Sequence, residues 1–473
     1  MKQQVLKNLV IAAMMTGVVG AAGATGTIRP IVTTPVTPSA DIVASSVVTT
    51  PIVGTVSTDT PVDLTLEKAI QMALDYNQSI KIAQHNLEQA EFNVNYANSG
   101  KMPTLGYTFS GKRSRADSTA NIVGNTFSNG LALTLPVYTG GKVEGAIGEA
   151  RYARESAREG VLLAEESTKL SAVTDYYDLL YKASLSDVDK ESVNNLAAHT
   201  KNVQAQYTVG TVAKLDVLTS QVSLANAKAT AISAENNVSV AEATLNTILG
   251  LPLQTKLNVA DHRLPFSPYN ISLTDAIAYA LEHHPEVRQA DYAVKKAEES
   301  VTVANSGNLP TVEVSAGRSI GTTQYYGNNN TSKGWNVGAG VTFNLFDGGA
   351  TRAEVGAAKA TVKAAKDTAQ QTRDLISLAV KQSYLNIYSA AERVRATQTA
   401  VAEAEESFNI ASVRYRAGVG INLDVLDAQL ALNQAKTNYV QALYDYNVGI
   451  AALENAMGVN VKESAQGAMK SNV

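Results

Sequence analysis

Three aspartates lie in two copies of one short motif and are the clearest candidates for charge-based chemistry. Asp216 stands in "KLDVL" and Asp424 in "NLDVL", each shortly after a glycine, and Asp427 follows one helical turn later. A carboxylate in the first turn of a helix is stabilised by the helix dipole by about 0.3–1 kcal/mol, so a structural role alone would explain Asp216 and Asp424. Asp427 lies beyond the reach of the dipole, and its counterpart in the first copy is Thr219. Capping therefore explains Asp427 less well.

Side chains that bind metals or act as nucleophiles are otherwise scarce. The 473 residues include five histidines and no cysteine, which excludes disulfides, thiolate metal sites, cysteine nucleophiles and a lipid on an N-terminal cysteine. His283 and His284 are adjacent and would point in different directions on a helix, and Pro285 indicates a helix boundary there. The sequence contains no recognisable acid–base pair, nucleophile triad, phosphate loop or metal cluster. The sequence therefore predicts no enzyme, metal or cofactor, and a net charge of −4 disfavours a nucleic-acid partner.

The first 60 residues have the composition of targeting and leader segments. Residues 1–24 combine early lysines with the apolar run "LVIAAMMTGVVGAAGA", and Ala22 and Ala24 form a small-residue cleavage pattern. This predicts a secretory signal peptide, with a retained anchor helix as the alternative. Residues 25–60 are rich in Thr, Val, Pro and Ser and predict an extended leader. No later segment approaches 18 consecutive apolar residues, which argues against a helical membrane protein.

The remainder of the chain is a tandem duplication. "ANSGKMPT" recurs as "ANSGNLPT", and "LTLEKAIQMALDYNQSI" from Leu64 aligns with "ISLTDAIAYALEHHPEV" from Ile271. After one inserted residue, "QYTVGTVAKLDVLTSQVSLANAK" from Gln206 aligns with "RYRAGVGINLDVLDAQLALNQAK" from Arg414. Self-similarity over such lengths indicates that one structural unit is built twice.

The alignment sets the expected domain boundaries. We predict a first structural repeat at 64–251 and a second at 271–459. A proline-bearing linker at 252–270 joins them, and residues 460–473 form a C-terminal tail.

Each repeat is expected to change from helix to strand at its "ANSG" motif. Glycine permits a left-handed helix ending and the proline beyond it prevents the helix from resuming, so we expect a left-handed glycine at Gly100. Two stretches with a period of two residues follow in each copy. In "WNVGAGVTFNLF", for example, Trp335, Val337 and Val341 alternate with small or polar residues. The polar stretches "SRADSTANIVGNT" and "TTQYYGNNNTSKG" are expected to be surface loops between strands.

The alternating stretches suit a transmembrane β-barrel, although a half-buried sheet in a soluble protein would alternate as well. Two strands per repeat give four per chain, whereas outer-membrane barrels close with about eight or more. A single chain would leave unpaired backbone groups in lipid. We therefore expect an oligomer, in which two chains would supply eight strands and three would supply twelve.

Long helices are expected to follow the strands. Ala-rich stretches begin after a Gly-Gly pair in each copy, at about 142–208 and 350–416, and each would extend ~100 Å as a helix. Small apolar residues recur every seven positions in the second stretch: Val355, Val362, Ala369 and Ile376. Such a narrow seam is typical of coiled coils. Each stretch ends at a glycine, Gly210 or Gly418, beyond which a second helix returns.

Together these features resemble the TolC-like outer membrane efflux protein family, also called outer membrane factors. The resemblance rests on the duplicated helix–strand–strand–helix units, the proline after the second helix, the "GG" after the strands and "YxxGxxxxLDVLxAQ" at the distal hairpins. It covers 64–459. It implies an α+β membrane protein, in which a homotrimer closes a transmembrane β-barrel with four strands per chain. It also implies a long α-helical coiled-coil barrel in the periplasm below the cell outer membrane.

The resemblance further implies roles for residues at the hairpin ends. Asp424 and Asp427 match aspartates that ring the periplasmic aperture, Asp216 matches an aspartate of the gate network, and Tyr415 matches its tyrosine. Where the family carries an arginine, this sequence has Gly420, so an arginine-mediated lock is not implied here. Candidate residues for docking an adaptor lie in the hairpin turns: Val209, Gly210, Thr211 and Gly418.

The function implied is a passive exit duct of a tripartite efflux or type I secretion system. Its partners would be a periplasmic adaptor, an inner-membrane pump and outer membrane lipid, and its cargo small molecules or polypeptides. Three copies would place six carboxylates, from Asp424 and Asp427, around one narrow mouth. Such a ring would concentrate cations and select against anions. The alternative is a periplasmic or surface coiled-coil protein with a structural role that conducts nothing.

Overall fold

The computed structural model describes residues 61–115, 123–261, 263–325 and 328–459. The predicted signal peptide at 1–24, the leader at 25–60 and the tail at 460–473 lie outside the described residues.

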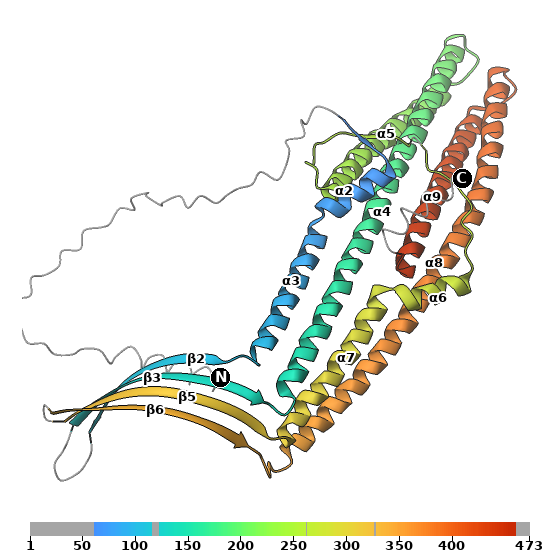
Figure 1. The fold of residues 1–473 in the computed structure, drawn as a ribbon. Helices are drawn as coiled ribbons and strands as arrows, with labels where there is room; N and C mark the ends of the chain where they lie inside the picture. The colour runs from blue at the N-terminus through green and yellow to red at the C-terminus, as the bar shows by residue number, and fades with distance from the viewer. Residues whose placement is uncertain (1–60, 116–122, 262, 326–327, 460–473) are drawn as a thin grey trace, which may run out of the picture. The chain divides into compact units, whose positions relative to one another are not determined.

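Two copies of one element order make up the described chain (Figure 1). The first contains β1 (Val62–Leu64), α2 (Leu66–Tyr76), α3 (Gln78–Ser99), β2 (Thr104–Arg115), β3 (Val123–Tyr138), α4 (Lys142–Thr208) and α5 (Lys214–Leu249). The second contains β4 (Leu257–Val259), α6 (Leu273–His283), α7 (Pro285–Asn305), the short 3-10 helix η1 (Ser306–Asn308), β5 (Thr311–Tyr325), β6 (Asn328–Thr342), α8 (Ala350–Arg416) and α9 (Asn422–Met457). Both copies therefore run from a short strand through helices and a strand pair into a long helical hairpin.

The long helices α4 and α8 have the bounds that the sequence predicts, and each has 67 residues. Along α8 the predicted seven-residue seam is the packed side of the helix, because Ala369 and Ile376 are buried and Val355 and Val362 are half-buried. Near the strands, α3, α4, α7 and α8 lie side by side in that order (Figure 1). Toward the hairpin turns, α4 packs against α5 and α9, and α8 packs against α9. No helix in the described part of the chain is both long and apolar enough to cross a membrane.

The backbone conformation of the "ANSG" motif differs from the one predicted. Gly100 ends α3 in the right-handed region, with φ −61° and ψ −15°, so the expected left-handed ending is wrong. A Cβ at Gly100 would lie 3.2 Å from Cγ1 of Val143, and one at Gly307 would lie 2.5 Å from Oγ1 of Thr351. The glycine is needed because the end of the second helix packs closely against the first turn of the long helix. The left-handed residues are Gly140 and Gly141, with φ 64° and 88°, just before α4.

The four long strands form one antiparallel sheet in the order β2-β3-β5-β6 (Figure 1). The strands have 12 to 16 residues, longer than the minimum that spans a bilayer. The expected loop "TTQYYGNNNTSKG" is wrong for most of its length, because β5 continues to Tyr325 and β6 begins at Asn328, and these two residues are paired. Cross-strand pairing of its threonines and asparagines extends the two strands to Tyr325 and Asn328.

The sheet has one apolar face, as the alternation predicts. Leu105, Leu133, Ala316 and Val337 are paired in one row across all four strands. Directly paired residues point to the same face, and the three larger members of this row are exposed. The neighbouring row on the other face is small or polar: Gly106, Ala132, Gly317 and Asn336. A sheet with one mainly apolar face, on which Arg318 is paired between Leu131 and Trp335, and one small polar face suits contact with lipid on the apolar side.

A compact core lies where the short elements meet the long helices. The predicted linker contributes β4, which pairs in parallel with β1 across three residues. Leu64 of β1, Tyr176 of α4, Leu245 of α5 and Tyr446 of α9 are buried in one cluster. The Tyr176 hydroxyl donates a hydrogen bond to Oδ2 of Asp261 (2.8 Å), which ties the linker to α4. This core holds the two helical hairpins in place relative to one another.

Candidate functional site

The hairpin turns carry the residues expected to dock an adaptor. Gly210 and Gly418 adopt positive φ, 81° and 74°, and a Cβ on either would meet no atom within 4 Å. Val209 and Thr211 are exposed, and the Thr211 hydroxyl donates to the carbonyl oxygen of Gln206 (2.9 Å). Both turns are therefore open surfaces at the ends of long helices, with glycine required by the backbone conformation.

The three predicted aspartates lie near the same turns. Asp216 is in the first turn of α5 and Asp424 in the first turn of α9, as predicted, and Asp427 follows in the next turn. Asp424 and Asp427 are exposed, whereas Asp216 is half-buried. The two exposed aspartates line an open groove between α9 and α8, together with acidic and basic side chains of α8: Glu403, Glu406 and Arg414. The arrangement gives the end of the second hairpin a surface rich in carboxylates.

A small apolar cluster joins the two hairpins just behind their turns. Val203, Val217, Tyr415 and Val425 are buried together, one from each of α4, α5, α8 and α9. The Tyr415 hydroxyl is buried and makes no hydrogen bond to Asp216 or to any other residue that the structure describes. Burial and then the negative charge of Asp216 raise the pKa of Tyr415. Tyr415 and Asp216 are thus brought close together within one chain, but without the bond that a gate network would use.

Close behind the turns, polar contact between the hairpins is made by Asn422, which sequence reasoning missed. Its Oδ1 accepts a hydrogen bond from Nε2 of His199 on α4 (2.6 Å) and lies 3.1 Å from the hydroxyl of Ser220 on α5, which also lies 2.8 Å from the backbone oxygen of Asp216. Its Nδ2 donates to the backbone oxygen of Asp216 (3.2 Å). Asn422 is 6% exposed, and His199 and Ser220 are also buried. We call these three residues the Asn422 latch, because they connect the second hairpin to both helices of the first.

His199 is neutral in this arrangement. Burial lowers the pKa of its imidazole, and the hydrogen bond to Asn422 only partly offsets that effect. The neutral ring therefore carries its proton on Nε2 and donates it to Asn422, while its edge lies against the Tyr415 ring with centroids 4.9 Å apart.

Gly420 explains why this turn has no arginine. A Cβ at this position would lie 3.1 Å from the backbone nitrogen of Tyr415 and 3.2 Å from the carbonyl carbon of Arg414. The N–H of Gly420 donates to the Arg414 oxygen (3.1 Å), which closes the turn tightly. Any larger residue at this position requires the turn to shift.

Comparison with known proteins assigns this architecture to a family. The family model described as outer membrane efflux protein matches residues 69–251 and 276–459, one match in each repeat. The chain belongs to the outer membrane efflux protein family. This efflux protein is accordingly a transport channel of the outer membrane, with its helical part in the periplasm, and not an enzyme. The membership decides against the non-conducting coiled-coil alternative.

Individual relatives span nearly the same length as this efflux protein. It is 26% identical over 400 residues to the outer membrane efflux protein BepC of Brucella suis, covering 83% of this chain and 85% of BepC. It is 24% identical over 412 residues to the outer membrane protein TolC of Escherichia coli, covering 83% and 82% of the two chains. The crystal structure of the outer membrane protein VceC of Vibrio cholerae has the same fold, with a TM-score of 0.70 at 19% identity over 83% of this chain and 96% of VceC.

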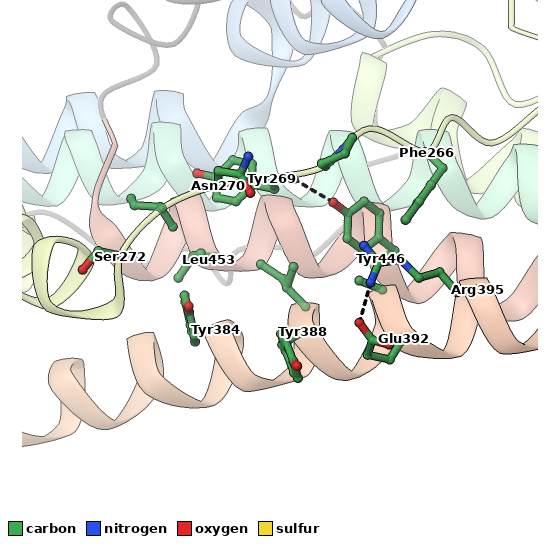
Figure 2. Close-up of a pocket in the computed structure, with 14 residues that line it drawn as sticks. Phe266, Tyr269, Asn270, Ser272, Tyr384, Tyr388, Glu392, Arg395, Tyr446 and Leu453 are labelled. Atoms are coloured by element: carbon green, nitrogen blue, oxygen red, sulfur yellow. Dashed lines mark hydrogen bonds and ion pairs between the residues drawn. The ribbon is translucent and has the colours of Figure 1, made fainter.

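A cavity of about 520 Å³ lies between the linker and helices α8 and α9 of the efflux protein. The linker residues Phe266 and Tyr269 form one wall, and Tyr384, Tyr388 and Tyr446 of α8 and α9 form another (Figure 2). The aspartates of the hairpin ends do not contribute to it. Within the described ranges, no three or more His, Asp or Glu side chains are grouped to hold a metal ion.

Proposed function

We propose that this efflux protein is the outer-membrane exit duct of a tripartite efflux or type I secretion system. In this proposal three copies close one channel, the hairpin turns dock a periplasmic adaptor beneath it, and Asp424 and Asp427 form an acidic gate at the periplasmic mouth. The observation that carries the proposal is that one chain supplies strands and long helices for a channel wall, but both edges of that wall lack a neighbour within the described chain.

The sheet supports closure by further copies. β2 and β6 are its edges, and each has a row of backbone groups without a strand partner in the described chain. In lipid such groups have no water to bond, so the edges must be paired. Within the chain, the second strand of the first repeat, β3, pairs with the first strand of the second, β5. The equivalent next step is that β6 pairs with β2 of another copy.

Two glycines of the second repeat support an equivalent contact between helices, in which α8 of one copy packs against α3 of another copy. In the first repeat, Gly148 of α4 lies against α7, where a Cβ would be 2.7 Å from Cγ of Glu299. Its counterpart Gly356 of α8 has no atom within 4 Å of a Cβ position. The counterpart of Glu299 is Phe92 on α3, which is 64% exposed. We expect Phe92 of a neighbouring copy to lie against Gly356.

The turn before the long helix shows the same difference between the repeats: a glycine that is closely contacted in the first repeat has an uncontacted counterpart in the second. A Cβ at Gly140 would lie 2.9 Å from Cβ of Leu309, whereas one at Gly348 would meet nothing within 4 Å. The counterpart of Leu309 is Met102, which is exposed at the end of α3. The second repeat thus keeps the small residues of a close contact, and the first repeat keeps the exposed side chains that would fill it. A head-to-tail contact of this kind closes into a ring when its rotation allows.

Cysteine cross-linking tests this arrangement directly, because the chain contains no cysteine of its own. Oxidation of a Phe92→Cys/Gly356→Cys variant is expected to join separate chains and to give products of two and three chains on a non-reducing gel. Either single variant is expected to stay uncrosslinked, since a head-to-tail contact brings different residues together. The matched control is Gly148→Cys/Glu299→Cys, in which the disulfide forms within one chain. Dimers from a single variant would contradict the proposed ring.

The acidic gate follows from the exposed positions of Asp424 and Asp427 at the start of α9. Three copies would bring six such carboxylates to one mouth, which would attract cations and bind multivalent cations tightly enough to block the pore. Opening requires the two hairpins of each copy to separate, which the docked adaptor would favour by binding the separated state more tightly.

Conductance across a planar bilayer tests the duct itself. The detergent-purified oligomer is expected to insert and to conduct in discrete steps, with the current carried mainly by cations. A folded oligomer that inserts and yet passes no current would contradict the proposed duct.

A further inference from the structure

Glu166 occupies an unusual position in the middle of α4. From residue 142 to 160, α4 packs against α7: Gln289 Nε2 donates to the Ser156 oxygen (3.0 Å), and the rings of Tyr152 and Tyr292 stack. Further along, α4 packs against α9, where Lys169 pairs with Glu454 (3.1 Å). The neighbour of α4 therefore changes between these two stretches, and Glu166 lies at the change.

The two neighbouring helices meet end to end at this level. α9 ends at Gly458 with φ 67°, and a Cβ there would lie 2.8 Å from Cα of His284, the residue that caps the start of α7. We call this meeting of α4, α7 and α9 the helix junction. The helices on its two sides lead respectively to the membrane strands and to the hairpin turns, so a loosened junction would let the hairpins move without unfolding either half.

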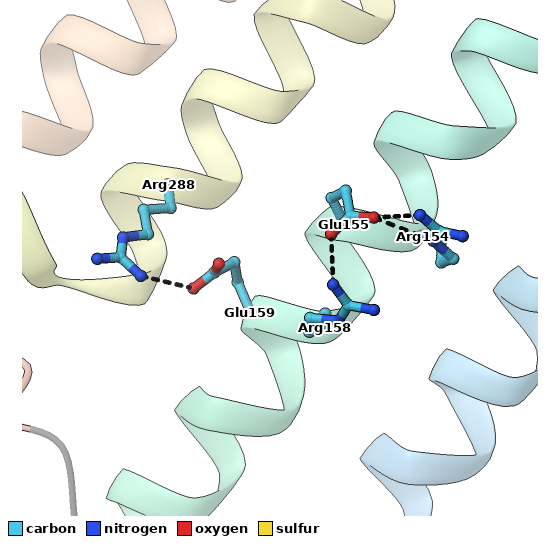
Figure 3. A network of polar contacts seen from close by, with 5 residues as sticks. All are labelled: Arg154, Glu155, Arg158, Glu159 and Arg288. Carbon is cyan, nitrogen blue, oxygen red and sulfur yellow. Dashed lines mark hydrogen bonds and ion pairs between the residues drawn. The ribbon is translucent and has the colours of Figure 1, made fainter.

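Two carboxylates of α4 are buried at the helix junction without full compensation. Glu159 and Glu166 are 7% and 6% exposed, and Oε2 of each has no hydrogen-bond donor among the described residues. Glu159 has a guanidinium 3.9 Å away, on Arg288 (Figure 3). The nearby arginines of α4, Arg154 and Arg158, bond to Glu155 instead (Figure 3). Buried carboxylates with a free oxygen are costly to keep ionised.

Charges of both signs face Glu166, and burial favours its neutral form. On α4 these are Glu159, Glu165 and Lys169, and on the first turn of α7 it is Glu286. On α9 the charge is Glu454, which engages the ammonium of Lys169. Burial is the largest effect, the three glutamates add to it, and Lys169 opposes it, so that the pKa of Glu166 is raised to about 7.

We propose that Glu166 is a proton-binding site that links packing of the helix junction to pH. In the packed junction its carboxyl group holds a proton near neutrality. When the junction loosens, water reaches the group and the proton leaves. Rising pH therefore favours the loosened junction, and acid favours the packed one. The link to channel opening rests on the proposed function, whereas the link to packing does not.

The sign of the effect on stability follows from proton linkage. Below pH 4.5, the usual pKa of a glutamate, both the folded and the unfolded chain are protonated and the contribution of Glu166 is fully favourable. As pH rises from there to about 7, the folded chain holds a proton that the unfolded chain has lost, so stability falls with pH. Above about pH 7 both states are ionised and this contribution is flat.

The test compares thermal midpoints of the detergent-purified protein from pH 5 to pH 9. The midpoint of Glu166→Gln, which is isosteric and always neutral, is expected to rise relative to wild type as pH increases, with the gap widest above about pH 7. Glu149→Gln, on the same helix but away from the helix junction and outside the charges that face Glu166, is the matched control and should follow wild type. Equal pH profiles for Glu166→Gln and wild type would overturn the proposal. A profile flattened by Glu159→Gln instead would place the proton on the other carboxylate and overturn it equally.

A second readout separates this inference from the proposed function. In planar bilayers, wild-type channels are expected to open more often at pH 8 than at pH 6, whereas Glu166→Gln channels should open equally often at both. Stability profiles as expected with no conductance at all would retain the proton site and reject the duct. Conductance whose pH dependence survives Glu166→Gln would retain the duct and reject the proton link.

Discussion

Replacing Asp424 and Asp427 together with asparagine is expected to remove most of the cation preference of the open channel. The reversal potential in a salt gradient should move toward zero, because the mouth loses six carboxylates in a trimer while its shape is kept. Block by a trivalent cation should weaken by at least about tenfold, which corresponds to only about 1.4 kcal/mol of lost attraction. Both residues are exposed, so the substitutions should leave the fold intact.

A matched pair of charge changes controls for the net charge of the protein. Glu88 and Glu91 are exposed on α3, far along the chain from the hairpin turns. Glu88→Gln/Glu91→Gln should leave selectivity and block unchanged. Unaltered selectivity in the aspartate variant, or equal losses in both variants, would move the selective region elsewhere in the channel.

Replacing Asn422 with leucine is expected to make the channel open spontaneously. Leucine has the same branching as asparagine but accepts no hydrogen bond, so Nε2 of His199 loses its acceptor, while the Ser220 hydroxyl keeps the Asp216 oxygen (2.8 Å). A buried donor left without an acceptor costs about 1–3 kcal/mol, and the contact between the hairpins should weaken by about this amount. The measurement is the open probability of single channels without any adaptor, which should increase by at least about tenfold.

The internal duplication supplies the control for this substitution. Lys214 is the counterpart of Asn422 in the first repeat and is exposed at the start of α5. Lys214→Leu should leave the open probability close to that of wild type. If Asn422→Leu channels stay closed as long as wild-type channels do, the Asn422 latch does not hold the resting state.

Local sequence rules predicted the elements of this fold well. The bounds of α4 and α8, the glycine turns after them and the apolar face of the sheet all follow from periodicity and from glycine positions close to them in the sequence. The errors occurred where packing overrides such rules. A glycine is required at position 100 because the end of α3 packs on Val143, not because its backbone is left-handed. The polar residues up to Tyr325 pair as a strand instead of forming a loop.

The candidate site was predictable only in part. The first-turn positions of Asp216 and Asp424 follow from the motif, whereas the Asn422 latch joins residues that are more than 200 positions apart in the chain. The signal that would have found the latch is a difference between the repeats. Asn422, His199 and Ser220 align with Lys214, Ser407 and Ala428, so each position breaks the duplication. Residues that differ between copies mark contacts that only one copy makes.

The most direct test of a channel gated by its hairpins is to lock them together and measure conductance. Ser220→Cys/Asn422→Cys places the only two cysteines of each chain where the native side chains are 3.1 Å apart, on different hairpins. Oxidised channels are expected to stay closed in a planar bilayer, and the same channels should open once a reductant is added. Oxidised channels that conduct as freely as reduced ones would show that the hairpins do not form the gate.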